Sequence, residues 1–165
     1  MKVKIILVGI VLIFDSIKIM AQELNESSFD FWVGNWEVTW TNPDGSEIIG
    51  SNKIVRTLNE KVIQENFRDP STNFQGTSIS VYSPTTNKWH QAWVDSDGAY
   101  YDFEGDIING APVFKTKMIE QNGEQIIQRM VFKDVQENSF IWIWEGTKNN
   151  GVSWSELWKI KYKRI

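Results

Sequence analysis

The sequence predicts an all-β protein, an antiparallel up-and-down β-barrel of about ten strands that follows a short helical turn. Three observations support this prediction. Short runs rich in β-branched and aromatic residues follow one another from Trp36 to Tyr162, turn-forming residues separate the runs, and none of the runs has the period of a helix. A long meander of this kind loses its two exposed edges when it closes, so a barrel is favoured over a sandwich.

The first expected strand shows the alternation most clearly. Trp36, Val38 and Trp40 alternate with polar residues, and a period of two is typical of a strand with one buried face. The run ends at a turn in which Pro43 presets one backbone dihedral angle and Gly45 supplies a positive φ.

The remaining strands are expected between similar turns. Asn109-Gly110 and Asn122-Gly123 are the strongest of these signals, because Asn-Gly between β-rich runs favours a tight hairpin. We expect strands at residues 47–58, 62–67, 75–82, 88–94, 100–107, 113–119, 125–135, 140–145 and 152–162. A short helical turn is expected within residues 23–31, with Ser27 or Ser28 as its cap.

Residues 1–21 have the composition of a secretory signal peptide. A basic start precedes an apolar run at residues 5–14, and Ala21 is a small residue at a suitable cleavage point. The run is too short to span a bilayer. We therefore expect an exported protein, periplasmic or secreted, in which residues 22–165 form a single barrel domain.

The charge excludes two classes of partner. The chain has a net charge of −4, and residues 1–21 carry three lysines and one aspartate, so their removal would leave −6. This balance argues against nucleic acid and against anionic lipid surfaces. Lys159, Lys161 and Lys163 alternate along the last expected strand. Because a lipid-facing strand would be apolar at such positions, we expect no stable membrane insertion.

The residues used most often for metal binding and nucleophilic catalysis are scarce. The sequence has no cysteine, and His90 is its only histidine. No Gly-x-Ser-x-Gly motif accompanies His90, and a zinc ion would lack further ligands. A structural, hydrogen-bonded His90 is the favoured interpretation, and haem ligation is a weaker alternative. We predict no metal and no cofactor, and we assign no catalytic residue.

Tryptophan is the most informative residue type. The chain has nine, all after residue 21, which predicts either an aromatic core or an aromatic-lined cavity. Trp89, Gln91 and Trp93 share one face of an expected strand. Two neighbouring late strands contribute four further indoles: Trp142, Trp144, Trp154 and Trp158.

Four glutamates lie in expected strands among aromatic residues: Glu65, Glu104, Glu145 and Glu156. An inward-facing carboxyl could act as a general acid or base on a sugar or another polar ligand. An outward-facing glutamate on a strand is equally ordinary. Glu65 is the leading candidate, because Arg56 lies one hairpin back and could pair with it.

Gly34-Asn35-Trp36, at the head of the first expected strand, resembles the Gly-x-Trp signature of lipocalins and their calycin relatives. In those barrels the tryptophan closes one end, and a basic residue late in the chain lies across its ring. The resemblance implies that Arg164 stacks on Trp36, with Lys163 and Arg129 as alternatives.

Three longer segments extend the likeness. FWVGNW (31–36), KWHQAWVDS (88–96) and WEGT through GVSW (144–154) resemble a bacterial family of unknown function that is grouped with calycins, the domain-of-unknown-function 1579 family. The closing Tyr162-Lys163-Arg164 is similar too, so the likeness covers nearly all of residues 22–165 in order. It implies a barrel and brings with it no reaction, cofactor or catalytic residue.

These observations predict a barrel that binds a small, partly apolar molecule in a cavity lined by tryptophan. The candidate ligand-binding residues are Trp89, Gln91, Trp93, Trp142, Trp144, Trp154, Trp158, Glu65, Arg56 and His90, and Gly34, Trp36 and Arg164 are the candidate plug. Two alternatives remain open. One is an enzyme of hydrolase or isomerase type on the same barrel, using His90 or an inward glutamate. The other is a structural or interaction domain with a filled core.

Overall fold

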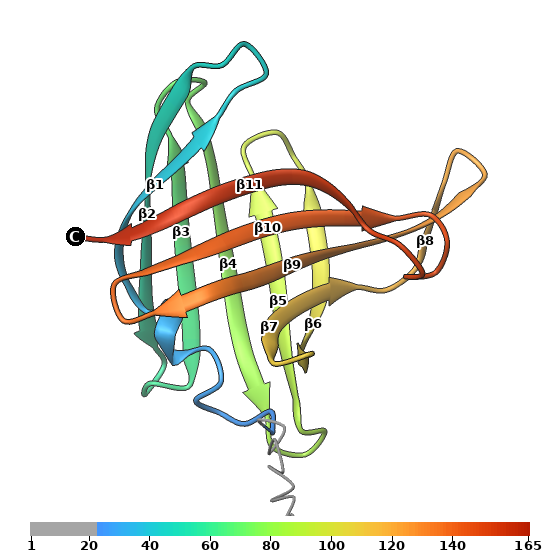
Figure 1. Ribbon diagram of the computed structural model, residues 1–165. Coiled ribbons are helices and arrows are strands. Elements are labelled where there is room, and N and C mark those ends of the chain that lie inside the picture. Colours follow the sequence, from blue (N-terminus) through green and yellow to red (C-terminus); the bar gives the residue numbers. More distant parts are fainter. Residues whose placement is uncertain (1–22) are drawn as a thin grey trace, which may run out of the picture.

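The protein is an all-β, closed antiparallel barrel, as predicted from the sequence (Figure 1). The computed structural model describes residues 23–165, so the expected signal peptide at residues 1–21 lies outside the described part. The elements are η1 (Asp30–Trp32), β1 (Gly34–Thr41), β2 (Glu47–Thr57), β3 (Val62–Asp69), β4 (Phe74–Ser83), β5 (Lys88–Asp95), β6 (Tyr100–Ile108), β7 (Ala111–Thr116), β8 (Ile119–Gln121), β9 (Glu124–Gln136), β10 (Ser139–Thr147) and β11 (Ser155–Arg164).

Ten strands form the barrel, and each pairs with its neighbours along the chain except where β8 intervenes. The order is β10-β11-β1-β2-β3-β4-β5-β6-β7-β9, and the pairing of β9 with β10 closes the ring. The first and last strands meet in register, with Trp36 opposite Arg164. β9, β10 and β11 lie side by side and cross the direction of β2 to β5 (Figure 1).

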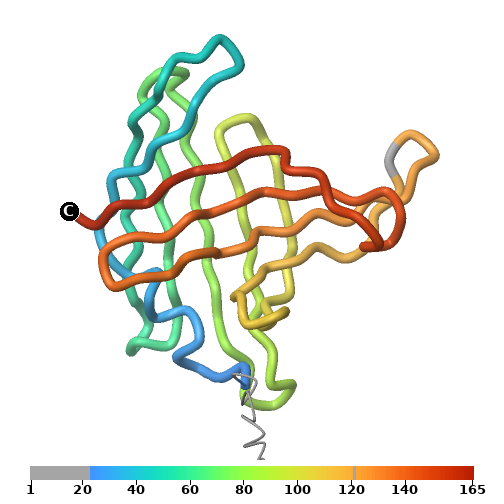
Figure 2. Tube along the Cα trace, viewed as in Figure 1, coloured from blue at the N-terminus to red at the C-terminus, as the bar shows by residue number. Residues whose placement is uncertain are grey.

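The expected strand at residues 113–119 is divided in two, which corrects its boundaries. β7 ends at Thr116 and β8 begins at Ile119, although both pair with β9. The β8–β9 hairpin projects away from the barrel and turns at Asn122-Gly123, both with positive φ (Figure 2). The last strand also begins later than expected, at Ser155.

The N-terminal segment closes the lower end of the barrel in Figure 1. The expected helical turn is present as the 3₁₀ helix η1, but neither serine caps it: its N-cap is Phe29, with no side-chain hydrogen bond. Asn25 organises the preceding turn instead, because its Oδ1 accepts a hydrogen bond from the Ser27 backbone N–H at 2.9 Å. Within residues 23–165, no helix is long and apolar enough to cross a membrane.

Large aromatic side chains fill this lower half. Phe29 stacks on Phe114 at 4.4 Å between ring centroids and meets Trp89 edge to face. The fully buried members of this aromatic plug are Phe29, Trp32, Trp36, Trp89, Phe114 and Phe132. The upper half of the barrel is packed less completely, and it contains the candidate site.

Candidate functional site

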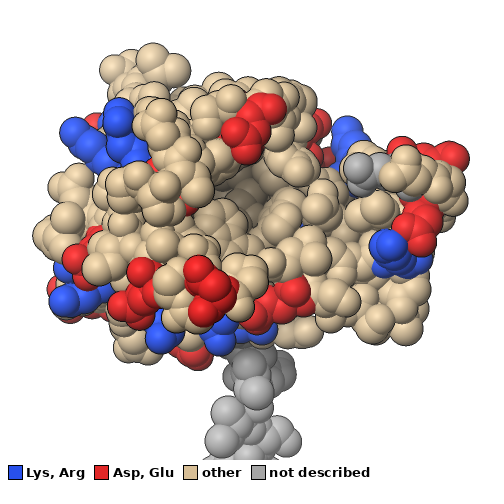
Figure 3. Space-filling model, turned by 90° about the horizontal axis from the view of Figure 1, so that it is seen from above, with Lys and Arg blue, Asp and Glu red and all other residues tan. Residues whose placement is uncertain are grey.

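A cavity of about 170 Å³ opens at the upper end of the barrel. Seen from above, it forms a hollow bordered mostly by uncharged side chains (Figure 3). Its lining consists of Glu65, Phe67, Phe74, Trp93, Asp95, Tyr101, Phe103, Met130, Trp142, Trp144, Trp158, Ile160 and Tyr162. These residues come from seven strands, since alternate residues of each barrel strand point inward.

The walls are aromatic rings set at near right angles. Trp142 and Trp144 lie two residues apart on β10, and their planes differ by only 6°. Trp158 on β11 stands at 86° to Trp142, and Tyr101 on β6 stands at 78° to Trp144. Edge-to-face pairs of this kind are favourable, so the rings stabilise one another's positions in the cavity wall.

The rim is shaped by a close approach of ring and backbone. Trp93 donates its indole N–H to Asp95 Oδ2 at 3.0 Å, and its ring lies over Gly76 on the neighbouring strand β4. A Cβ at position 76 would lie 2.0 Å from the Trp93 ring. Glycine is therefore required there for Trp93 to take this position.

The floor of the cavity contains a buried carboxyl group. Glu65, on β3, is 5% exposed. Its Oε1 accepts a hydrogen bond from Asn52 Nδ2 at 2.6 Å, and its Oε2 accepts one from Ser78 Oγ at 2.7 Å. Ser78 lies directly opposite Glu65 on β4, and Asn52 lies on β2, opposite Phe67. Three adjacent strands thus converge on one carboxyl group.

Tyr162, on β11, completes the floor. Its hydroxyl accepts a second hydrogen bond from Asn52 Nδ2, at 3.0 Å. Burial raises the pKa of Glu65 to about 7, although the bonds from Asn52 and Ser78 lower it in part. Burial and the nearby Glu65 charge raise the pKa of Tyr162 well above its usual value. The Glu65 carboxyl is therefore partly protonated near neutral pH.

The charges around the cavity have one sign. Of the described residues that line it, Glu65 and Asp95 are acidic, and none is lysine, arginine or histidine. Asp95 is engaged at the rim, where its Oδ1 accepts the backbone N–H groups of Asp97 and Ala99. Glu65 alone contributes a carboxyl at the bottom.

Four of the six tryptophans predicted to bind the ligand line the cavity, and the other two do not. Trp93, Trp142, Trp144 and Trp158 line it, together with Glu65. Trp89 points inward but lies in the aromatic plug, where its indole donates to Asn25 O. Gln91, on the same face, is buried and donates to Ser80 Oγ at 2.9 Å. Trp154 lies before β11 and stacks on Arg129, 3.8 Å from guanidinium to ring.

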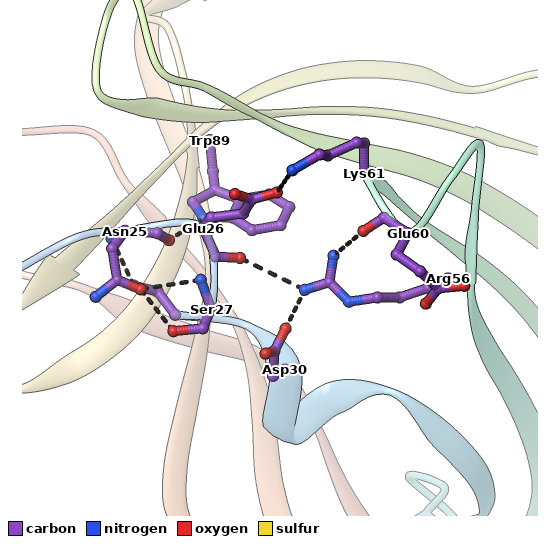
Figure 4. Close-up of polar contacts among 9 residues, drawn as sticks. Asn25, Glu26, Ser27, Asp30, Arg56, Glu60, Lys61 and Trp89 are labelled. Atoms are coloured by element: carbon purple, nitrogen blue, oxygen red, sulfur yellow. Dashed lines mark hydrogen bonds and ion pairs between the residues drawn. The ribbon is translucent and has the colours of Figure 1, made fainter.

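Arg56 does not pair with Glu65, which corrects that expectation. It lies at the lower end of β2, where it pairs with Asp30 and donates to the backbone carbonyls of Glu60 and Glu26 (Figure 4). Lys61 forms a second ion pair there, with Glu26 at 2.6 Å. These contacts fasten the N-terminal segment to the β2–β3 hairpin, at the opposite end from the cavity.

His90 lies outside the barrel interior. It alternates with Trp89 and Gln91 along β5, and because those residues are buried inside, His90 faces outward. It lies opposite Val81 on β4 and Glu104 on β6. This placement removes His90 from the residues that can contact a molecule in the cavity.

The predicted plug residues meet at the lower end. The Arg164 guanidinium lies 4.1 Å from the Trp36 ring centroid and donates to the carbonyls of Val33, Phe31 and Glu137. Gly34 lies directly beneath it, and a Cβ there would be 2.1 Å from Arg164 Nη1. The Trp36 indole donates to Trp32 O at 2.8 Å.

Sequence reasoning missed Asn52, Ser78 and Tyr162 on the floor of the cavity. A signal existed for Asn52, because it shares the inward face of β2 with the apolar Ile54. A polar residue in such a position needs a partner, and its partner is the Glu65 carboxyl. Ser78 and Tyr162 carry no comparable signal, since small and aromatic residues are ordinary inside barrels.

The described residues include no cluster of three or more histidine, cysteine or acidic side chains able to hold a metal ion. No known family model matches the sequence, and no curated protein is significantly similar to it. The site must therefore be interpreted from its own chemistry: an aromatic box with a titratable carboxyl at its base.

Proposed function

We propose that the protein is an exported binding protein that holds a small, partly apolar molecule in the aromatic cavity. The observation that carries this proposal is the open cavity of about 170 Å³, lined by four tryptophans above Glu65. A barrel with a purely structural interior has no need for an open space of this kind, because interiors normally pack without voids.

The size of the cavity limits its occupant. An apolar cavity of about 150 Å³ in another protein is large enough for benzene, so this one suits a molecule of about one ring. The rings would bury the apolar part of such a molecule, and the Glu65 carboxyl would bind a polar group at its end. The ligand would enter from the upper end, because the aromatic plug fills the lower one.

Export is supported by the sequence alone. The basic start, the apolar run at residues 5–14 and Ala21 agree with a cleaved signal peptide. Cell fractionation after expression of the full chain in a bacterium, with N-terminal sequencing of the product, tests this part. We expect mature protein outside the cytoplasm that begins at Gln22; cytoplasmic protein that retains Met1 would contradict export.

Native mass spectrometry of protein purified gently from an exporting host tests the binding function. We expect a reproducible added mass of a small molecule that is absent after denaturation. The matched control is a variant with Trp144→Ala, which enlarges and opens the cavity and should lower the occupied fraction. A bare polypeptide mass under all conditions would shift support to the alternatives.

A second candidate function is proton transfer to or from a molecule in the same cavity. It is favoured by the position of Glu65 among aromatic rings at the base of the cavity, where burial raises the pKa of its carboxyl to about 7, as suits a general acid or base. Such chemistry would be an isomerisation or hydrolysis. A bound molecule whose turnover stops in Glu65→Gln while its binding persists would support this function over binding alone.

A further inference from the structure

We infer that the ligand of the aromatic cavity is a small organic cation, an amine carrying one apolar group, whose ammonium pairs with Glu65. This inference rests on the proposed binding function and specifies its ligand class. It is carried by the joint geometry of the charged floor and the aromatic walls.

The charges that line the cavity favour a cation. Glu65 and Asp95 are the charged residues among the described residues that line the cavity, and no basic side chain is present to neutralise an anion. A carboxylate or phosphate ligand would be buried beside Glu65 without a counter-charge, which is strongly unfavourable. An ammonium group in the same place would give Glu65 the cationic partner that it lacks.

The aromatic rings of the cavity wall favour a cation as well. Trp142 and Trp144 are parallel, and Trp158 and Tyr101 stand nearly perpendicular to them. The faces of aromatic rings carry negative charge density and attract a cation, so walls of this kind favour a cationic occupant over an anionic one. Indole gives the strongest such attraction, and four indoles line this cavity.

The Glu65 carboxylate on the floor can accept further hydrogen bonds. Each oxygen of Glu65 accepts one hydrogen bond from the protein, whereas a carboxylate oxygen can accept two. Both donors are neutral. A primary ammonium, which has three N–H donors, could therefore bind Glu65 without displacing Asn52 or Ser78.

Binding of a cation should be coupled to loss of a proton. The titratable groups of the lining are Glu65, Asp95 on β5, Tyr101 on β6 and Tyr162 on β11. The other groups that contact Glu65, from β2 and β4, are the neutral Asn52 and Ser78. An ammonium next to Glu65 favours the ionised carboxylate. The amine should consequently bind more weakly below about pH 6 than at about pH 8 and should release a proton between these values.

Three probes with one skeleton test the inference: benzylamine, benzyl alcohol and benzoate, which at about pH 8 are positive, neutral and negative. Isothermal titration calorimetry with the whole mature protein, in two buffers of different ionisation enthalpy, gives affinity and proton release. We expect benzylamine to bind at least about tenfold more tightly than benzyl alcohol, and benzoate not to bind.

Glu65→Gln should remove this preference, so that benzylamine and benzyl alcohol bind alike. Glu104→Gln is the matched control, because Glu104 is an exposed glutamate on the outer face of β6, and it should keep the wild-type preference. If Glu65→Gln does not fold, the probe series and the proton release of the wild-type protein still decide the question. Equal or tighter binding of benzyl alcohol or benzoate would overturn the cation inference and leave the binding function standing. Failure of all three probes to bind would overturn both.

Discussion

At the scale of single residues, Glu65 stands out because its buried position disfavours the charged form of its carboxyl. Its two hydrogen bonds come from neutral groups, and burial raises its pKa to about 7. The sequence alone indicated Glu65 as a candidate but assigned it the wrong partner. Arg56 lies on the same side of β2 as Asn52, yet it is two inward positions closer to the lower end, where Asp30 neutralises it. The position of Arg56 along β2 therefore determines that it pairs with Asp30 and not with Glu65, and composition does not reveal this position.

Glu65→Gln should change how stability depends on pH. In the folded protein Glu65 keeps its proton up to about pH 7, whereas in the unfolded chain it loses it near the usual pKa of 4.5. Its contribution to stability is therefore fully present below pH 4.5 and is lost as the pH rises to about 7. The loss is on the order of 3 kcal/mol.

Urea unfolding at about pH 5 and about pH 8 measures this change. The difference between the two free energies of unfolding should be smaller in Glu65→Gln than in the wild type, and Glu104→Gln should behave as the wild type. An unchanged difference in Glu65→Gln would show that Glu65 titrates normally in the folded protein.

Gly76→Ala should disturb the rim of the cavity. The new Cβ would lie 2.0 Å from the Trp93 ring, so the ring must move and lose its hydrogen bond to Asp95. We expect a loss of about 1–3 kcal/mol in the free energy of unfolding. The indole N–H resonance of Trp93 should also shift in the NMR spectrum. Gln75→Ala, an exposed side chain next in sequence, is the control and should leave both unchanged.

At the scale of elements, most strands could be predicted because each depends on local signals, namely alternation and turn residues. Two exceptions come from local contacts that compete with the predicted pattern. β7 and β8 are separated at Lys117 and Met118 because β8 pairs with the far end of β9, beyond the barrel. The predicted cap of η1 was wrong because Ser27 and Ser28 form hydrogen bonds with Asn25 instead of with the helix. Residue-type preferences do not reveal which of two competing local arrangements forms.

Arg164→Lys should weaken the junction of three elements. Arg164, near the end of β11, holds carbonyls of η1, of the residue after it and of the β9–β10 turn, while its flat group lies on Trp36. Lysine keeps the charge but cannot bind three carbonyls and stack at the same time. We expect a loss of about 2 kcal/mol by urea unfolding. Lys163→Ala, the exposed neighbour, should cost little, and an Arg164→Lys variant as stable as the wild type would refute this role.

At the scale of the whole molecule, the barrel exists because its first and last strands meet. β11 joins β10 to β1, and its inward residues Ile160 and Tyr162 are buried in the core. Each of the ten barrel strands is paired with a strand on both sides, so each depends on closure of the ring. The sequence predicted this closure from the length of the meander, but it could not show which half of the interior is filled. That difference arises from Phe29 and Trp32, which enter the lower end from outside the strands.

Truncation after Lys159 should therefore abolish the fold rather than loosen one edge. It removes Ile160, Tyr162 and Arg164, and it leaves β1 and the first half of β10 with unpaired edges, which favours aggregation. Circular dichroism with size-exclusion chromatography should show no cooperative thermal transition and no monomer. A monomer that retains a sharp transition would mean that closure is dispensable.

Seven of the nine tryptophans fall into two groups, which has a practical consequence, and Trp40 and Trp154 belong to neither group. Trp93, Trp142, Trp144 and Trp158 line the cavity, whereas Trp32, Trp36 and Trp89 are fully enclosed in the plug. The protein therefore contains its own fluorescent reporter and its own internal reference. An occupant of the cavity would alter the emission of the first group and shield it from a soluble quencher such as acrylamide, while the second group would continue to emit as before. Occupancy can then be followed by light alone, without a label on protein or ligand.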